Sequence, residues 1–435
     1  MIAGTLFALS MRMRAARMLA WSVAVVSLLG GLPLGPLVGQ QTGSDTVTAY
    51  DAGAPPQARN RLTPWLTVGA KLELDYEFRR HWDLTNRGGD DRSTLAPEPS
   101  LAVAVTPNAG TRAFLSLELS RRFALGRPDN GDRDLAIELR QAYLQLKSRG
   151  DGRYSVRLGR QRFKDRREWI HDAELDGLRF RYDTGPLDIE LALTPGTNTF
   201  SLETDLRLTS DVRVGTFMLL GGRRPSEGGR LLLGVRSDGD LAPNLEYWAQ
   251  VARLAGRDGA TVVRATGIDV GVTYQPDVLL RPALTLAYAY GSGDADPGDR
   301  IETQFRQTGL QGNQERMAGV TNLKYYGELL DPELSNLTIA TVGLGLRPSR
   351  RSSVELILHG YRQPIVSAEL HGANVSADPS GRHRDIGSEI DLILGYREIR
   401  DVTLKLVLGW FHPGRAFEDP AESSAFGEFT IDFRI

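Results

Sequence analysis

The chain has 435 residues, with 52 Lys plus Arg against 54 Asp plus Glu and a formal net charge of −2. This balance argues against a nucleic-acid-binding protein, which usually carries a strongly basic surface. The sequence contains no cysteine, which excludes disulfides and thiolate zinc sites, and a hydrophobic content of 41% argues against a helical membrane protein.

Residues 1–39 have the layout of a secretory signal peptide. Three arginines precede an apolar run over residues 18–29, and small and turn-forming residues follow it. A transmembrane anchor is the alternative, but the run is shorter than the roughly 20 residues that a spanning helix needs. Residues 40–62 are polar and contain proline, so we expect a flexible N-terminal segment before a single domain at 63–435.

Alternation of apolar and polar residues begins at Leu66 and continues to Phe78. Every even-numbered position in this stretch is apolar or aromatic, while the odd-numbered positions include Lys71, Glu73 and Asp75. The stretch is longer than a typical globular strand of about 5 to 6 residues. It suits a tilted membrane strand, which needs about 9 to 11 residues to cross a bilayer.

The same period recurs to the end of the chain. We predict further strands at residues 100–106, 112–120, 135–146, 153–163, 174–182, 187–194, 199–208, 212–221, 229–236, 244–254, 262–274, 281–291, 336–347, 352–362, 385–397, 401–411 and 425–435. The total is about eighteen, an even number, as in single-chain bacterial outer-membrane barrels. A change of parity near Arg140 indicates a β-bulge.

The predicted connections alternate in length. With the N-terminus inside, the periplasmic turns are short and most external connections are longer, which is typical of outer-membrane barrels. The longest is 292–335, where Tyr325 and Tyr326 could fold inward as a constriction or cap the barrel. A soluble β-sandwich has no reason to sort its connections in this way. We therefore expect an all-β transmembrane antiparallel barrel in the outer membrane of a Gram-negative-type bacterium.

The most concentrated basic region is residues 154–182, where two strands flank a charged excursion. Arg157, Arg179 and Arg181 lie on the polar register of these strands, and pairing of the strands would bring them side by side. Guanidinium groups bind carboxylates through paired hydrogen bonds and stay charged. We predict that these arginines line a path for anions; the alternative is that they belong to ion-pair networks that stiffen the barrel.

The remaining candidate residues also follow from the polar register. The other predicted lumen residues are Lys71, Arg213, Arg397, Glu389 and Asp391. Arg160, Arg162 and Lys164 would lie at the external end of the basic hairpin, either as a positive vestibule or as a solvated loop. Acidic residues are frequent on the same register, so selectivity for anions requires that arginines occupy the narrowest point.

Enzymatic activity is not predicted. The six histidines fall mostly in predicted external loops, and no nucleophile-elbow or paired zinc-ligand motif accompanies them. We assign no catalytic residue, metal or cofactor, and we rank a barrel-embedded hydrolase and a purely structural barrel below a transport channel.

Several blocks resemble the alginate export family of outer-membrane barrels. They are LGRQRF (158–163), LDGLRF (175–180), FRQTGLQGNQERMAGVTNLKYYGELLDPELSNL (305–337), HGYRQ (359–363), IGSEIDLILGY (386–396) and WFHPGRAF (410–417). The resemblance extends over nearly the whole mature chain. It implies a barrel of about eighteen strands that conducts an anionic exopolysaccharide past lumen arginines. The alternative is a porin for small anions or sugars.

The expected partners follow from this assignment. They are an anionic polysaccharide or small anions in the lumen, outer-membrane lipid around the barrel, and periplasmic export proteins. We expect a monomer, and no nucleic-acid partner.

Overall fold

A computed structural model of the protein describes residues 58–85, 91–125, 134–148, 153–221, 229–418 and 421–435. The predicted signal peptide at 1–39 and most of the predicted flexible segment lie outside these residues. The end of that segment is ordered, because Asn60–Thr63 forms the short strand β1 against β2 (Leu66–Arg80). In the described part of the chain, no helix is long and apolar enough to cross a membrane.

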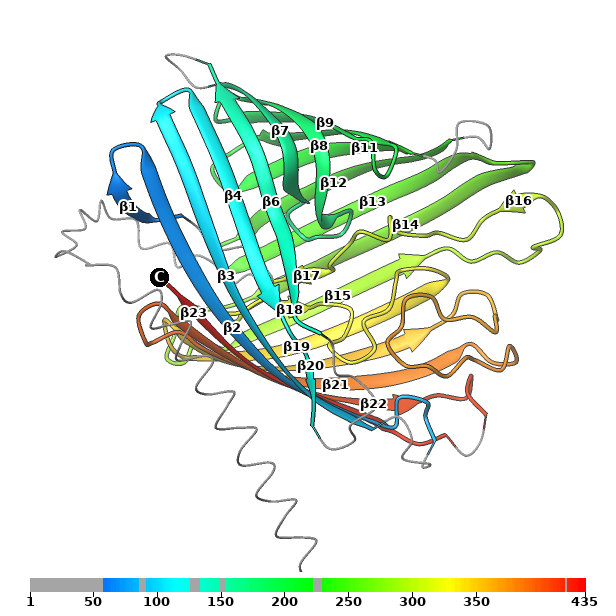
Figure 1. Cartoon of the computed structure of the whole chain (residues 1–435). Coiled ribbons are helices and arrows are strands. Elements are labelled where there is room, and N and C mark those ends of the chain that lie inside the picture. The colour runs from blue at the N-terminus through cyan, green and yellow to red at the C-terminus, as the bar shows by residue number, and fades with distance from the viewer. Residues whose placement is uncertain (1–57, 86–90, 126–133, 149–152, 222–228, 419–420) are drawn as a thin grey trace, which may run out of the picture. The chain divides into compact units, whose positions relative to one another are not determined.

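The described residues form a closed antiparallel barrel of 18 strands (Figure 1). Its wall consists, in order, of β2, β3 (Arg92–Asn108), β4 (Thr111–Ser120), β6 (Ala136–Lys147), β7 (Tyr154–Lys164), β8 (Asp172–Asp183), β9 (Leu187–Thr194), β10 (Thr199–Arg207), β11 (Val212–Gly221), β12 (Arg230–Ala242), β13 (Leu245–Asp258), β14 (Thr261–Tyr274), β15 (Ala283–Gly291), β19 (Leu337–Ser349), β20 (Ser352–Arg362), β21 (Asp385–Tyr396), β22 (Val402–Pro413) and β23 (Ser424–Arg434). The short strands β5 (Phe123–Ala124), β16 (Ile301–Glu302), β17 (Gln314–Glu315) and β18 (Leu323–Lys324) belong to the connections.

The barrel closes where the last strand meets the first. Strand β23 pairs antiparallel with β2, with Phe433 opposite Leu72 and Phe429 opposite Tyr76. The backbone groups of Ile435 and Ala70 exchange hydrogen bonds of 2.9 and 3.0 Å. Closure removes the two free edges that an open sheet would present to lipid, where unpaired backbone groups are too costly.

The two registers of each strand have opposite environments. On β20, Leu356 and Leu358 are 38% and 40% exposed on the outside, whereas Glu355 and His359 are 2% exposed on the inside. A soluble barrel would place the apolar register in its core. The outward apolar register therefore faces lipid, and the lumen receives the charged side chains.

Two predicted details of the strands have different outcomes. The predicted bulge is confirmed, because Ser116 of β4 pairs with Gln141 and Leu117 with Leu139, which leaves Arg140 as the extra residue. The predicted start of the second strand at residue 100 is wrong, since β3 begins at Arg92. Two prolines hid the first part of this strand: Pro97 and Pro99 lie in register with residues of β2 although proline lacks the N–H that a ladder uses.

The predicted sorting of connections by length holds for most of them, with 195–198 and 259–260 as short external exceptions. At one end, which we call the periplasmic end, the connections are 109–110, 148–153, 184–186, 208–211, 243–244, 275–282, 350–351 and 397–401. At the other, external end they are 81–91, 121–135, 165–171, 195–198, 222–229, 259–260, 292–336, 363–384 and 414–423. The longest external connection turns back into the barrel, as described below.

The outward register predicts how the wall responds to charge. Leu344 lies near the middle of β19 and is 50% exposed toward lipid. Leu344→Arg should lower the free energy of unfolding by about 2 to 4 kcal/mol, because a cation near the bilayer midplane is poorly solvated. Reversible unfolding from lipid vesicles measures this loss.

The matched control is Thr338→Arg, on the same face of the same strand but at its external end. Here the cost should be about 0 to 1 kcal/mol, because the side chain reaches the interface. Equal costs at both positions would contradict the assignment of this register to lipid.

Candidate functional site in the lumen

The connection 292–336 forms a plug inside the barrel. Seven of its large apolar side chains are at most 2% exposed: Phe305, Leu323, Tyr325, Tyr326, Leu329, Leu330 and Leu334. They belong to one cluster with Ile357, Tyr361 and Phe411, which point inward from β20 and β22. Of the two predicted positions for Tyr325 and Tyr326, the structure therefore shows the inward one.

Carboxylates on the wall hold the backbone of the plug. Glu389 of β21 accepts hydrogen bonds from the N–H groups of Leu329 (2.7 Å) and Leu330 (3.0 Å). Asp391, on the same face, accepts one from the N–H of Glu328 at 3.2 Å. Both wall carboxylates are 0% exposed. The two predicted lumen acids thus anchor the plug and do not line open space.

The connection 165–171 also folds inward and braces the plug. Trp169 stacks on Phe305 with ring centroids 6.0 Å apart, and its Nε1 donates to the Tyr326 hydroxyl at 2.9 Å. Asp165 accepts hydrogen bonds of 2.9 Å from the N–H groups of Ile170 and His171, which fixes the inward turn. Within this inward turn Arg167 is buried, whereas Arg166 remains exposed.

Arg167 shows how a cation is kept inside this assembly. It is 5% exposed, and its guanidinium lies 4.3 Å from the ring centroids of both Trp248 and Tyr325. Burial alone would lower the pKa of Arg167, but the carboxylates of Glu315 and Asp269 outweigh burial and raise the pKa above its ordinary value. The side chain is a charged structural link between the two inward connections and the wall.

Between these inward connections and the wall lies a first cavity of about 320 Å³, which we call the Arg181 cavity. Its charged lining residues are Lys164, Asp165, Arg166, Arg181, Asp183, Asp188, Glu190, Glu203, Asp205, Arg207, Arg213 and Arg236. It extends from the β8–β9 turn at 184–186 to the inward connection. Cations and acids are equally numerous on its lining.

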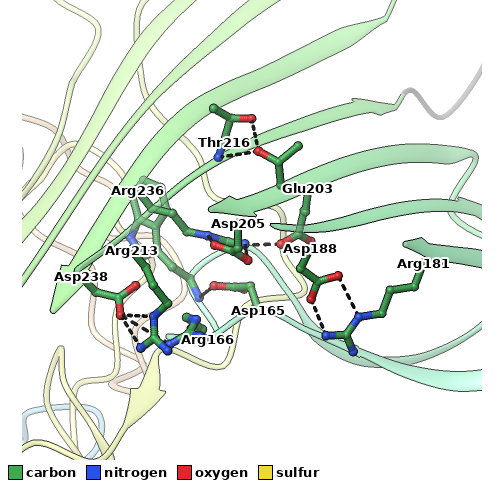
Figure 2. Close-up of polar contacts among 12 residues, drawn as sticks. Asp165, Arg166, Arg181, Asp188, Glu203, Asp205, Arg213, Thr216, Arg236 and Asp238 are labelled. Carbon is green, nitrogen blue, oxygen red and sulfur yellow. Dashed lines mark hydrogen bonds and ion pairs between the residues drawn. The ribbon is translucent and has the colours of Figure 1, made fainter. Parts of the chain in front are cut away.

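Most arginines of this cavity are held by neighbouring carboxylates (Figure 2). Arg181 of β8 makes a two-pronged contact with Asp188 of β9, with Nε 2.8 Å from Oδ1. Arg236 of β12 donates to Asp205 at 2.7 and 3.1 Å and to Glu203 at 3.0 Å. These pairs fix guanidinium groups in a water-accessible groove without making the groove positive.

Arg213 and Arg166 share a single carboxylate. Arg213 of β11 reaches the Oδ2 atom of Asp238 at 2.7 Å, and Arg166 of the inward connection reaches the same atom at 3.4 Å. Burial lowers the pKa of Arg166, an effect that Asp238 opposes and the charge of Arg213 reinforces. The predicted lumen position of Arg213 thus lies beside a second cation that comes from a loop.

A second cavity of about 390 Å³, the Arg316 cavity, shares Lys164 and Arg166 with the first. Its other charged lining residues are Arg316, Arg347, Glu246 and Glu315. Cations therefore outnumber acids here, and in the part of the chain that the structure describes neither Arg316 nor Arg347 makes an ion pair. Arg347 stands close to the periplasmic turn at 350–351, so the positive cavity faces the periplasmic end.

The three arginines predicted from the basic hairpin lie where the pairing of strands places them. Arg157 and Arg179 are directly opposite each other in the β7–β8 register. Arg157 lies 4.3 Å from the ring centroid of Tyr143, and Arg179 pairs with Glu190 at 3.1 Å. Arg181 lines the Arg181 cavity. Strand register brings them together, but each has a protein partner that occupies part of its binding capacity.

The remaining predicted cations are spread around the barrel. Lys71 is 3% exposed and pairs with Glu73. Its Nζ also lies 3.9 Å from the carboxylate of Asp432. Arg397 follows β21 at the periplasmic end, where its N–H donates to the carbonyl of Arg351 at 2.8 Å. Both lie apart from the two cavities.

The predicted external vestibule is divided. Arg160 donates from Nε to the carbonyl of Leu139 at 2.8 Å, and Arg162 donates to Asp172 at 2.7 Å. Lys164 pairs with Glu168 and lines both cavities. Only the first two remain at the outer end of the β7–β8 hairpin, since the chain turns into the lumen after Lys164.

Three cavity arginines were missed by sequence reasoning, namely Arg236, Arg316 and Arg347. Arg236 lies on β12, where Leu231, Leu233 and Val235 mark the outward register, and its position on the opposite register was the available signal. Arg316 lies in the plug, whose position in space no periodicity reveals. The run MAGVTNLKYYGELL that follows Arg316 is unusually apolar for an external loop, and this was the available signal.

One side of the lumen is acidic. Among the described residues, Glu73, Asp75 and Glu98 form the one group of possible metal ligands whose oxygens lie within 4.8 Å of one another. Such a set has donors that suit a hard cation. Lys71 already balances one of its charges.

Comparison with known families gives a match over most of the chain. The sequence model of the family described as "Alginate export" matches residues 64–207 and 222–429. The chain is 26% identical over 238 residues to the alginate production protein AlgE of Pseudomonas aeruginosa, covering 46% of this chain and 47% of that protein. A second AlgE, from Azotobacter vinelandii, is 26% identical over 183 residues and is covered to 37%. The chain thus spans less than half the length of these curated relatives.

Solved structures agree with the fold. The barrel of Pseudomonas aeruginosa OccK11 (OpdR) superposes with a TM-score of 0.57 at 14% identity, covering 85% of this chain and 96% of that chain. Acinetobacter baumannii OccAB2 gives a TM-score of 0.58 at 11% identity, with coverages of 85% and 98%. At such identities the likeness concerns the fold alone.

The anchoring of the plug can be tested at Glu389. Glu389→Ala should leave two buried N–H groups without acceptors, at a cost of about 1 to 3 kcal/mol each, and loosen the plug. We expect a larger and noisier single-channel conductance in planar bilayers. Glu389→Gln is the control, because it keeps one acceptor oxygen; an unchanged conductance for the alanine variant would contradict the anchoring role.

The inward connection should respond to pH through His171, whose Nε2 lies 3.2 Å from Oε1 of Glu203. Burial lowers the pKa of His171, but the hydrogen bond and charge of Glu203 outweigh it, so the pKa is raised. The contribution of this pair to stability is full below the unfolded pKa of about 6.5 and is lost as the pH rises through the higher folded pKa.

Hydrogen exchange of residues 165–171 should therefore become faster, relative to a reference loop, as the pH rises above neutrality. In His171→Gln this additional pH dependence should disappear. The same pH dependence in both proteins would show that another group is responsible.

Proposed function

The chain belongs to the alginate export family, and from this premise we propose that it is an outer-membrane channel that passes an anionic, alginate-like polysaccharide through an arginine-containing lumen. The observation that carries the proposal is the Arg316 cavity, where cations outnumber acids and Arg316 and Arg347 lack carboxylate partners among the described residues. A polyuronate that enters from the periplasmic end meets these two guanidinium groups early.

The physical argument rests on charge in a confined space. Guanidinium groups bind carboxylates through two parallel hydrogen bonds and remain charged at any physiological pH. A narrow, low-dielectric wall focuses their field and raises the local concentration of anions. The unpaired pair at Arg316 and Arg347 would supply the attraction that the balanced Arg181 cavity lacks.

The paired arginines have a complementary role in this proposal. Conduction requires that each site binds well enough to fill and weakly enough to empty. Arg181 and Arg236 are already held by Asp188 and by Glu203 with Asp205. A polymer carboxylate would exchange with a protein carboxylate at each of them, so no single site would retain the chain.

The proposal is tested by reversing charge in the positive cavity. Arg316→Glu with Arg347→Glu should lower the preference for anions by roughly tenfold in permeability ratio, as expected for about 1 to 2 kcal/mol per ion at a lumen site. Reversal potentials in planar bilayers measure the ratio, and block by polymannuronate against neutral dextran measures polymer entry.

Two further double variants make the test specific. Arg157→Glu with Arg179→Glu should have a smaller effect, because Arg179 already pairs with Glu190. Arg253→Glu with Arg264→Glu places the same charges at exposed positions of β13 and β14 and should leave selectivity unchanged. Heat-modifiable gel migration checks that each barrel is intact. Equal block by the charged and the neutral polymer would contradict a polyanion channel and favour a small-solute porin.

A further inference from the structure

The barrel wall is interrupted between β6 and β7 in its external half. The two strands pair only from Lys147 opposite Ser155 to Ala142 opposite Arg160. Beyond this point β6 continues along β4, and β7 continues along β8, but β6 and β7 no longer pair with each other. We call the space between residues 136–141 and 161–164 the notch; in Figure 1 the external part of β6 diverges from β7.

At the unpaired end of β6, side chains on both faces of the strand are exposed. Ile137 is 70% exposed and Leu139 is 43% exposed, and their neighbours Ala136 and Glu138, which point to the opposite side, are exposed as well. In a strand paired on both sides of a filled barrel, only the lipid register shows such exposure. This end of β6 therefore stands clear of the packed interior.

The strands part at a defined position. Gly159 has a φ of 120° and lies opposite Tyr143, next to the last pair of the β6–β7 ladder. A Cβ atom at this glycine would collide with the carbonyl of Ala142, so only glycine allows the close approach of the two strands here. The backbone conformation at the end of the β6–β7 ladder therefore requires this glycine.

Side chains, not backbone hydrogen bonds, span the notch. Arg160 of β7 donates to the carbonyl of Leu139 on β6 at 2.8 Å, and Arg140 of β6 pairs with Glu174 of β8 at 3.1 Å. Such bridges can open by rotation of a few side-chain bonds, whereas opening a paired ladder would break several backbone hydrogen bonds at once.

The β7 edge of the notch lies beyond the apolar band of the β7–β8 hairpin. The last outward apolar pair of the β7–β8 hairpin is Leu158 opposite Leu178. The next outward pair is Arg160 opposite Asp176, with the charged groups 3.8 Å apart. Charged side chains on the lipid face are costly at the bilayer midplane and are tolerated at the interface, so this pair marks the outer boundary of the apolar band on the β7–β8 hairpin.

Another sector of the external end is covered. The connections that follow β2, β20 and β22 bond to one another and to the plug: Ser376 donates to Trp82 at 2.7 Å, and Ser380 to Ala416 at 2.6 Å. Asn374 donates to the carbonyl of Leu330 in the plug at 2.9 Å. Beside the notch, in the part of the chain that the structure describes, the connection 165–171 is turned inward and 195–198 is short.

From this asymmetry we propose that the notch is a side exit, through which the anionic polysaccharide leaves the lumen above the lipid instead of along the barrel axis. The inference rests on the proposed function. Arg157 and Arg179 lie on the inner wall just below the notch, and Arg140, Arg160 and Arg162 lie along its edges. Each edge arginine has a carboxylate partner, which favours brief contacts with a passing polymer.

The side exit is tested by closing it with a bridge. The natural chain has no cysteine, so the pair Leu139→Cys with Arg162→Cys can be joined across the notch by a short bis-maleimide with a reducible spacer. Leu144→Cys with Leu158→Cys is the matched control, because these residues already face each other in the paired part of the same two strands. Full-length protein is placed in vesicles loaded with fluorescent polymannuronate, and its release is followed.

We expect that release is lost when the notch is bridged and returns on reduction, while small-ion conductance persists and the control is unaffected. Undiminished release from the bridged protein would overturn the side exit and leave the channel function standing. No release from the unmodified protein would overturn both. If the first variant does not assemble, Ile137→Cys with Lys164→Cys closes the same gap.

Discussion

The structure depends on one constraint: inside a bilayer, backbone N–H and C=O groups must find partners within the protein. A sheet meets this requirement only by closing on itself, which β2 and β23 do along most of their lengths. Closure then determines which side chains meet lipid and which meet the lumen. Most charged side chains of the wall therefore point into the lumen, where cations and acids lie close enough to form ion pairs.

The balance of cations and acids differs between two parts of the lumen. Along β8 to β12 most cations are matched to a nearby acid, so that the wall carries little net charge. At the periplasmic end the plug contributes Arg316 to a cavity with few acids, and the field there is positive. The difference arises because the wall is built from adjacent strands, whose charges can alternate in register, whereas the plug brings in a cation from a distant segment.

The plug is held in place by the same need that closes the barrel, namely that buried backbone groups require hydrogen-bond partners. A loop buried in the lumen has backbone N–H groups that lose their water, and Glu389, Asp391 and Glu355 supply the missing acceptors. These wall carboxylates lie on the lumen register, but they accept hydrogen bonds from a buried loop and do not line an open channel. The notch between β6 and β7 is one place in the described ladder where neighbouring strands stop pairing, and its β7 edge lies beyond the apolar band of the β7–β8 hairpin, where water can satisfy free backbone groups.

The barrel, its strands, the length pattern of most connections and the side-by-side position of Arg157 and Arg179 are readable from the sequence, because a period of two and the pairing of neighbours along the chain are local properties. Even the bulge at Arg140 is visible as a change of parity. The three-dimensional structure was needed to show that residues 292–336 enter the lumen, that Glu389 and Asp391 bind this plug, and that Arg316 and Arg347 line the same cavity. These contacts join segments far apart in the chain, and their formation depends on buried area and on the satisfaction of backbone groups, which leave no periodic trace in the sequence.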